Sequence, residues 1–280
     1  MDLLRKKQLE IIACKIRMGI IEGVFNAKSG HPGGSLSIAD LLTYLYFEKM
    51  NIYPEKPKLE DRDRLVLSKG HCAPGLYSAL ANRGFFSVDE LKTLRHIGSR
   101  LQGHPDMKAI PGVDMSTGSL GQGISAACGM ALGAKVTQNP FKVYAILGDG
   151  EIQEGQVWEA AMFAAHYKLD NLVAIVDNNG LQIDGKITDV MSPEPITDKF
   201  KAFGWHVITM KAHDFDDIER AFNESESISG QPVVIIQSST KGRHVSFMEN
   251  NVSWHGSAPN AEQYELAMKE LNTILNVLEG

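Results

Sequence analysis

Short apolar runs alternate with helical stretches along most of this chain, and this alternation constrains its fold more than any other feature. The apolar runs are Arg64–Ser68, Val143–Leu147, Leu172–Val176, His206–Met210 and Val233–Gln237. The helical stretches between them include Gly121–Val136, Gln153–Tyr167 and Phe215–Asn223. Strands buried on both faces give near-continuous apolar runs, and parallel strands are usually joined by helices. The pattern therefore predicts an α/β fold, a parallel sheet with helices on both faces.

Helices are also expected outside the alternating region. Leu9–Val24 carries an apolar residue every three to four positions, and Ile38–Met50 follows a glycine-rich loop with Ser37 as its N-cap. A last helix is expected over about residues 261–278. We find no internal repeat and no interdomain linker, so residues 1–280 are expected to form one domain.

Two long segments show neither the helical nor the strand periodicity of apolar residues. They are Ile97–Thr117 and Thr240–Pro259. Structureless loops longer than about 12 to 15 residues in a compact domain are usually functional or disordered. Both segments contain histidines, so we expect them to contribute to a site.

Composition excludes several classes of protein. Hydrophobic residues make up 43% and charged residues 22%, as in ordinary soluble domains. The net charge of −6 and the absence of a dense basic run disfavour nucleic acid as a partner. No apolar stretch approaches the roughly 20 residues that span a bilayer, and the first residues do not resemble an export signal. Three unpaired-looking cysteines fit a reducing compartment, so the chain is expected to be cytoplasmic.

Oxygen-bearing side chains follow two of the predicted strands directly. Gly148-Asp149-Gly150 ends one strand, and Asp177-Asn178-Asn179 ends the next one along the chain. Gly-Asp-Gly alone is often only a tight turn. The two together, at the carboxyl ends of neighbouring strands, suit Mg²⁺, which prefers oxygen ligands and usually shares them with phosphates.

A P-loop-like pattern beside this site is misleading. Gly180–Lys186 matches G-x-x-x-x-G-K, but Ile187 stands where a P-loop needs a hydroxyl. The segment 188–195 does not read as the helix that a P-loop requires. Nucleotide hydrolysis is therefore not favoured.

The segment Gly118–Gly123 opens an alanine-rich helix. A helix N-terminus offers free N–H groups and a favourable dipole to an anion, so this segment is a candidate diphosphate cradle. Close helix packing through small residues explains it about as well. Its spacing, G-x-x-G-x-G, differs from the dinucleotide fingerprint.

Four histidines lie beside glycine or proline in predicted loops: His31, His71, His104 and His255. Imidazole can hold phosphate or sugar oxygens and can move protons near neutral pH. Any one of these residues is more readily explained as an ordinary loop histidine. Four in similar settings favour a shared site, and none has the short spacing common in zinc sites.

Taken in order, the motifs SGHPG, DRLVLSKGH, GHP, STGSLGQG, GDGEIQEG and DNN resemble the N-terminal, diphosphate-binding domain of transketolases. The resemblance covers nearly the whole chain. It implies the PP-type fold of thiamine-diphosphate enzymes, with thiamine diphosphate and Mg²⁺, or another divalent cation such as Ca²⁺ or Mn²⁺, as cofactors. The cofactor would carry the difficult bond chemistry.

The resemblance also implies roles for individual residues. Asp149, Asn179 and the carbonyl of Leu181 correspond to metal ligands. Cofactor contacts would come from His71, Gly118, Ser119, Leu120, Gly150, Glu154, Asn179 and His255. His31, His104 and His255 resemble catalytic histidines that handle substrate hydroxyls and protons, and Glu154 resembles a residue that couples cofactor sites across a subunit interface.

The length departs from that of most transketolases, which carry an aminopyrimidine-binding domain and a C-terminal domain as well. The resemblance therefore implies the N-terminal subunit of a split transketolase, which transfers a two-carbon ketol group from a ketose phosphate to an aldose phosphate. A separate C-terminal subunit would complete it, in an α₂β₂ assembly. The alternatives are a deoxyxylulose-phosphate synthase-like enzyme, a dehydrogenase E1 α subunit, or a noncatalytic cofactor-binding subunit. Proton work on sugar hydroxyls explains His31 and His104 together, which decarboxylation of a 2-oxo acid does not require.

Overall fold

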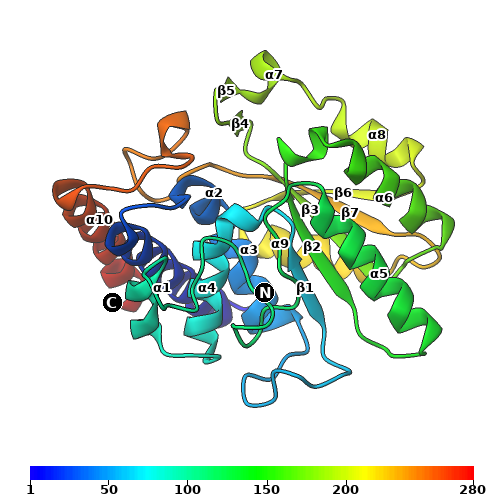
Figure 1. Cartoon of the computed structure of the whole chain (residues 1–280), viewed down its shortest axis with the longest axis horizontal. Coiled ribbons are helices and arrows are strands. Elements are labelled where there is room, and N and C mark those ends of the chain that lie inside the picture. The colour runs from blue at the N-terminus through cyan, green and yellow to red at the C-terminus, as the bar shows by residue number, and fades with distance from the viewer.

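A five-stranded parallel sheet forms the centre of the computed structural model, which describes residues 1–280 (Figure 1). The strand order is β1-β2-β3-β7-β6. The strands are β1 (Arg64–Leu67), β2 (Val143–Gly148), β3 (Leu172–Asn178), β6 (His206–Lys211) and β7 (Val233–Ser238). All five predicted strands are confirmed to within two residues. Because every pairing is parallel, their carboxyl ends meet at one edge of the sheet.

Helices cover both faces of the sheet, as predicted (Figure 1). Alternate strand residues point to opposite faces and pack into two separate cores. One core contains α5 (Gln122–Val136), α6 (Gly155–His166) and α8 (Ile196–Ala202). The larger core contains α1 (Leu3–Ala27), α3 (Ala39–Tyr44), α4 (Ala73–Arg83), α9 (Phe215–Glu226) and α10 (Ala261–Glu279).

Capping side chains define the two terminal helices. α1 begins at Leu3, earlier than the apolar period suggests, because the Asp2 carboxylate accepts from the backbone N–H groups of Leu4 and Arg5. α10 begins with a capping box, in which Asn260 and Gln263 each bond the other's backbone N–H. The two helices lie side by side, α10 packing along α1.

The region after α1 differs from the prediction. The expected helix Ile38–Met50 is present as α3 followed by a π-helical turn, Leu45–Lys49, but the glycine-rich loop expected before it is a further helix, α2 (Pro32–Ser37). The glycine-rich segment is helical because Pro32 begins α2, where its missing N–H costs nothing. Ser37 is not an N-cap, since its hydroxyl donates to the carbonyl of Gly34 and to Asp177.

Besides α2 and the single turn α7 (Ile187–Val190), two longer helices were not predicted, α4 and α8. α4 is rich in small residues and ends where Gly84 takes a positive φ of 98°. α8 is only seven residues long, and its pattern is too short to show a period.

The remaining elements are short. They are the hairpin of β4 (Leu181–Gln182) and β5 (Gly185–Lys186), the single turn α7 (Ile187–Val190), and 3₁₀ turns at Gly70–Cys72, Val88–Thr93, Glu151–Gln153 and Val252–Trp254. The segments 97–117 and 240–259 otherwise have no regular structure, as predicted. The P-loop-like segment forms this hairpin and one helical turn, so it is not a P-loop.

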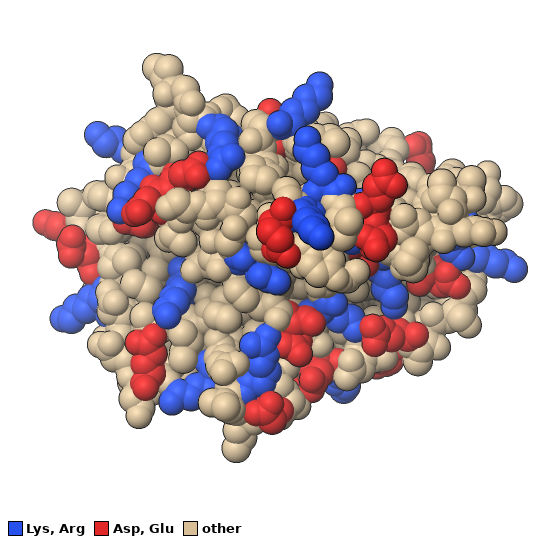
Figure 2. Space-filling model, turned by 90° about the horizontal axis from the view of Figure 1, so that it is seen from below, with Lys and Arg blue, Asp and Glu red and all other residues tan.

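Charges of both signs are interspersed on the face shown in Figure 2. No helix is both long enough and apolar enough to cross a bilayer. The three cysteines, Cys14, Cys72 and Cys128, are buried as free thiols.

Candidate active site

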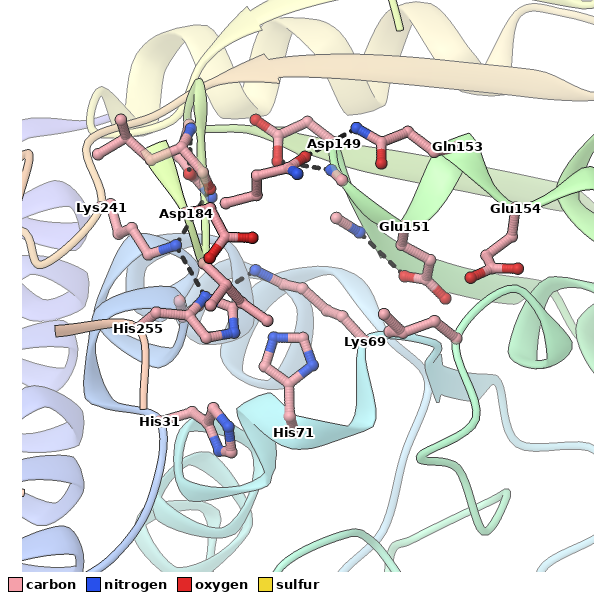
Figure 3. Close-up of a pocket in the computed structure, with 18 of the residues that line it drawn as sticks. His31, Lys69, His71, Asp149, Glu151, Gln153, Glu154, Asp184, Lys241 and His255 are labelled. Atoms are coloured by element: carbon pink, nitrogen blue, oxygen red, sulfur yellow. Dashed lines mark hydrogen bonds between the residues drawn. The ribbon is translucent and has the colours of Figure 1, made fainter. Parts of the chain in front are cut away.

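A cavity of about 490 Å³ lies where β2 and β3 end, and it collects all but one of the predicted site residues (Figure 3). Those lining it are His31, His71, His104, Gly118, Leu120, Asp149, Gly150, Glu154, Asn179, Leu181 and His255. Ser119 is the exception, because it lines a smaller neighbouring depression. Sequence motifs more than 200 residues apart, from His31 to His255, therefore meet in one place.

One wall of the cavity presents oxygen atoms from the ends of β2 and β3. The Asp149 carboxylate accepts from the backbone N–H groups of Gly150 at 2.9 Å and Gly180 at 2.6 Å. Asn179 Oδ1 accepts from the N–H of Leu181 at 3.1 Å. Burial, and then the charge of Asp177, raise the pKa of Asp149 to about 6. A divalent cation would offset that cost, because it favours the charged carboxylate.

The donor set fits a hard cation that shares its ligands with a diphosphate. A carboxylate, an amide and a carbonyl oxygen suit Mg²⁺. No group of three or more His, Cys, Asp or Glu side chains is placed to hold a metal alone, so remaining ligands would come from the bound molecule or water. Bare backbone lines the adjoining wall at Gly148 and Gly150, where an added Cβ would have no neighbour within 3.4 Å. The cavity can therefore take a phosphorylated ligand close to the main chain.

Three imidazoles form the opposite wall (Figure 3). The ring centroids of His31, His71 and His255 lie 5.1 to 5.5 Å apart. Burial is the largest cause that lowers their pKa values, to about 4 for His31 and His71 and about 3 for His255. All three are therefore neutral at pH 7. His31 Nδ1 is buried and has no hydrogen-bond partner within the chain.

Lys241 joins the two walls. Its ammonium donates to the carbonyl of Leu181 at 3.1 Å and to Nδ1 of His255 at 3.0 Å. Since an ammonium only donates, Nδ1 of His255 is an acceptor and the ring proton lies on Nε2. Burial lowers the pKa of Lys241. Sequence reasoning missed this residue, because no nearby motif marks it.

His104 and Glu154 lie on other parts of the rim. The His104 ring packs over Gly118, where an added Cβ would come within 3.0 Å of it. Burial, and then the charge of Arg95, lower the pKa of His104. Glu154 is exposed and precedes α6, away from the three clustered histidines (Figure 3).

The predicted anion cradle at the start of α5 needs correction. The buried carboxylate of Glu151 accepts from the N–H of Gly121 at 3.0 Å and from the hydroxyl of Ser68 at 2.5 Å. The protein's own carboxylate therefore uses an amide that was expected to face a ligand. The backbone of this segment that borders the cavity is at Gly118 and Leu120.

Sequence reasoning also missed Lys69 and Glu151, and it named Asp177 only as one of the oxygen-bearing side chains at the end of a strand. Each lies inside a recognised motif, SKGH, GDGE and DNN, next to a residue that was singled out. All three are buried. A buried charged residue requires a partner of opposite charge or hydrogen bonds. A charged residue next to a predicted buried strand could therefore have pointed to these positions.

Comparison with known proteins agrees with this geometry. The family profile described as "Transketolase, thiamine diphosphate binding domain" matches residues 8–273. One subunit of the apulose-4-phosphate transketolase of Phocaeicola vulgatus is 45% identical over 97% of this chain and 96% of its own length. Human transketolase is 40% identical over 96% of this chain but only 43% of its own length.

A solved structure gives the same result. The transketolase of Campylobacter jejuni superposes with a TM-score of 0.90 at 32% identity, covering 97% of this chain and 43% of that one. The fold and cavity define a thiamine-diphosphate-binding fold. The chain belongs to the transketolase family and corresponds to its thiamine diphosphate binding domain. The relatives are transketolases, which are transferases, so the dehydrogenase and synthase alternatives are not supported.

Proposed function

We propose that this chain is the cofactor-binding subunit of a two-chain transketolase that moves a two-carbon ketol group from a ketose phosphate to an aldose phosphate. One observation carries the proposal. A single cavity brings together oxygen donors for a metal, bare glycine backbone for a diphosphate, and neutral histidines for proton work.

Asp149, Asn179 and the carbonyl of Leu181 would hold Mg²⁺, with Ca²⁺ or Mn²⁺ as substitutes. His71, Gly118, Leu120 and Gly150 line the same cavity and would contact the cofactor. When bound, thiamine diphosphate supplies the carbanion chemistry that breaks and forms the C–C bond. Ser119 lies outside the cavity, so its backbone would act only through its neighbours Gly118 and Leu120.

The histidines would orient the sugar and move its hydroxyl protons. His255 presents Nε2–H, because Lys241 occupies its Nδ1. It would therefore donate a hydrogen bond. His31 and His104 also line the cavity, and they would accept a proton from a substrate hydroxyl.

A partner chain is part of the proposal. The bacterial relatives that this chain covers almost completely are named as subunits. We infer that residues 1–280 form one diphosphate-binding domain. The partner would bind the aminopyrimidine in an α₂β₂ assembly, with the exposed Glu154 coupling neighbouring sites. We place this complex in the cytoplasm, in pentose phosphate metabolism.

The substrate is expected to be a ketose with an anionic end. One relative is named for apulose-4-phosphate, and another, from Clostridium sp., for 6-deoxy-6-sulfo-D-fructose at 45% identity. Both names describe a sugar with a negatively charged group at its terminus. Recognition of that group would belong to the partner, and it would set which sugar is used.

Reconstitution tests the proposal. This chain is assayed for ketol transfer alone and after coexpression with the aminopyrimidine-binding chain encoded in the same genome, with thiamine diphosphate and Mg²⁺. We expect negligible transfer alone and robust transfer from the mixture. Full activity of this chain alone would refute the requirement for a partner. Cofactor binding by the mixture without any transfer would favour a noncatalytic role.

A further inference from the structure

The buried carboxylate of Asp177 sits behind the proposed metal ligands, and it accepts hydrogen bonds from five side chains. Ser37, Lys69 and Asn179 donate to Oδ2, at 2.6, 2.5 and 3.2 Å. Gln237 and Ser239 donate to Oδ1, at 3.0 and 2.5 Å. The donors come from α2, from the β1–α4 connection, from the residue after β3, and from β7 with the residue after it. One carboxylate therefore joins four separate segments at the edge of the sheet.

The positive charge of Lys69 balances the buried carboxylate of Asp177. Asp177 is fully buried and the Lys69 side chain is 3% exposed, so the two form a closed ion pair. The Lys69 ammonium, which can only donate, lies 2.5 Å from Oδ2, so this oxygen is an acceptor. Lys69 also donates to the carbonyl of Gly34 at 3.1 Å, which ties the pair to α2.

The contact with Asn179 has a consequence for the site. An ionised carboxylate only accepts, so it can face only the NH₂ end of the Asn179 amide. That fixes Nδ2 toward Asp177 at 3.2 Å and leaves Oδ1 toward the N–H of Leu181 and the cavity. The N–H of Leu181 favours the same orientation, so without Asp177 the amide loses one of the two groups that orient it.

From this geometry we propose that Asp177, neutralised by Lys69, is a positioning residue that selects the orientation of the Asn179 amide and so presents its oxygen to the metal. The inference rests on the proposed function, because it assumes a metal at Asn179. Asp177 does not line the cavity, so it would touch neither a bound metal nor a substrate. It would act only through Asn179.

Metal selectivity separates this role from simple stability. Mg²⁺ demands near-octahedral geometry, whereas Ca²⁺ accepts six to eight ligands in flexible arrangements. Replacing both members of the ion pair by amides, Lys69→Gln with Asp177→Asn, keeps the shape, leaves no unpaired buried charge and removes the ammonium that would hold an oxygen toward Asn179. We expect Mg²⁺-supported binding of thiamine diphosphate to weaken by about 10- to 100-fold, as for other groups that orient metal ligands. Ca²⁺-supported binding should weaken less.

The experiment measures the dissociation constant of thiamine diphosphate by calorimetry, in saturating Mg²⁺ and in saturating Ca²⁺, for the full chain. The readout is the ratio of the two constants. Asp114→Asn is the matched control, because Asp114 is also a buried carboxylate paired with a cation, Arg62, but near the opposite end of β1. The control should leave the ratio unchanged.

Asp177→Asn alone is the folding control, because Lys69 still faces an oxygen of the new side chain at the position of Oδ2, and that oxygen still accepts from Asn179. We expect the single variant to shift the ratio less than the double variant does. An unchanged ratio in the double variant, or an equal shift in Asp114→Asn, would overturn the inference. If the unmodified chain failed to bind thiamine diphosphate in both Mg²⁺ and Ca²⁺, the proposed function would be refuted, and this inference with it.

Discussion

Individual side chains in the cavity are held by residues that are distant from them in the sequence. Lys241 lies 60 residues from Leu181 and 14 from His255, yet its ammonium contacts both. It thereby fixes the oxygen of a proposed metal ligand and the tautomer of a proposed catalytic histidine. Its removal should affect the histidine in a measurable way.

Replacing Lys241 by methionine should raise the pKa of His255. Burial is the largest cause that lowers this pKa to about 3, and the Lys241 charge is the next. The variant removes the second cause only, so the pKa should rise but stay below its ordinary value. The neutral ring would then become protonated at a higher pH than in the unmodified chain. NMR titration of the ring nitrogens between pH 3 and 7 measures this directly.

Lys186→Met is the control for this prediction, since Lys186 is exposed on β5 and loses the same charge. It should leave the His255 titration where it was. An identical titration curve in Lys241→Met and the unmodified chain would show that the ammonium does not act on the ring.

Among individual residues, the sequence predicted those that belong to local motifs and missed those whose partners lie on distant segments. Asp149 and Asn179 were predictable because each follows an apolar strand directly. Lys241 was not, because its partners lie on other segments. Glu151 was not predictable for the same reason. Its carboxylate accepts from the N–H of Gly121, an amide at the start of α5 that was expected to bind a ligand.

Among the elements, α5 shows how closely the site depends on backbone packing. Its first turn lies against the end of β1, where an added Cβ at Gly123 would fall 2.6 Å from Ser68 Cα. Ser68 in turn donates to Glu151, which orders the loop after β2. Further along the same helix, Gly129 faces open space.

The two glycines should respond oppositely to alanine. Gly123→Ala should lower the free energy of unfolding by about 1 to 3 kcal/mol, because the backbone of Ser68 cannot move aside cheaply. Gly129→Ala should raise it by up to about 1 kcal/mol, since alanine restricts the unfolded chain and nothing obstructs its methyl group. Urea denaturation of the isolated chain measures both. Equal effects of the two substitutions would contradict the packing described at β1.

The strands were predictable because burial on both faces leaves an unbroken apolar run, as in Leu172–Val176. α2 was not, because its sequence, PGGSLS, contains glycines that normally disfavour helices. Its residues are all buried, so tertiary packing overrides that propensity. α8 buries only Ile196 and Phe200, too few positions to show a period.

For the whole molecule, the sheet divides two cores, and the cavity lies at the one edge where every parallel strand ends. In that cavity the chain presents carboxylate, amide and carbonyl oxygens, bare glycine backbone and neutral histidines. The central claim is that it recognises the diphosphate through a cation. Thiamine, which lacks the diphosphate, should therefore bind this chain too weakly to measure.

Calorimetric titration of the chain tests that claim most directly. Thiamine diphosphate should bind in Mg²⁺, while thiamine in Mg²⁺, and thiamine diphosphate in a chelator, should give no measurable binding. Asp149→Ala should weaken binding by about 10- to 100-fold, the loss of one hydrogen-bonded charge. Asp184→Asn, which alters another carboxylate in the same cavity, should change it little. Equal binding of thiamine and thiamine diphosphate, or binding that ignores Mg²⁺ and Asp149, would contradict the account.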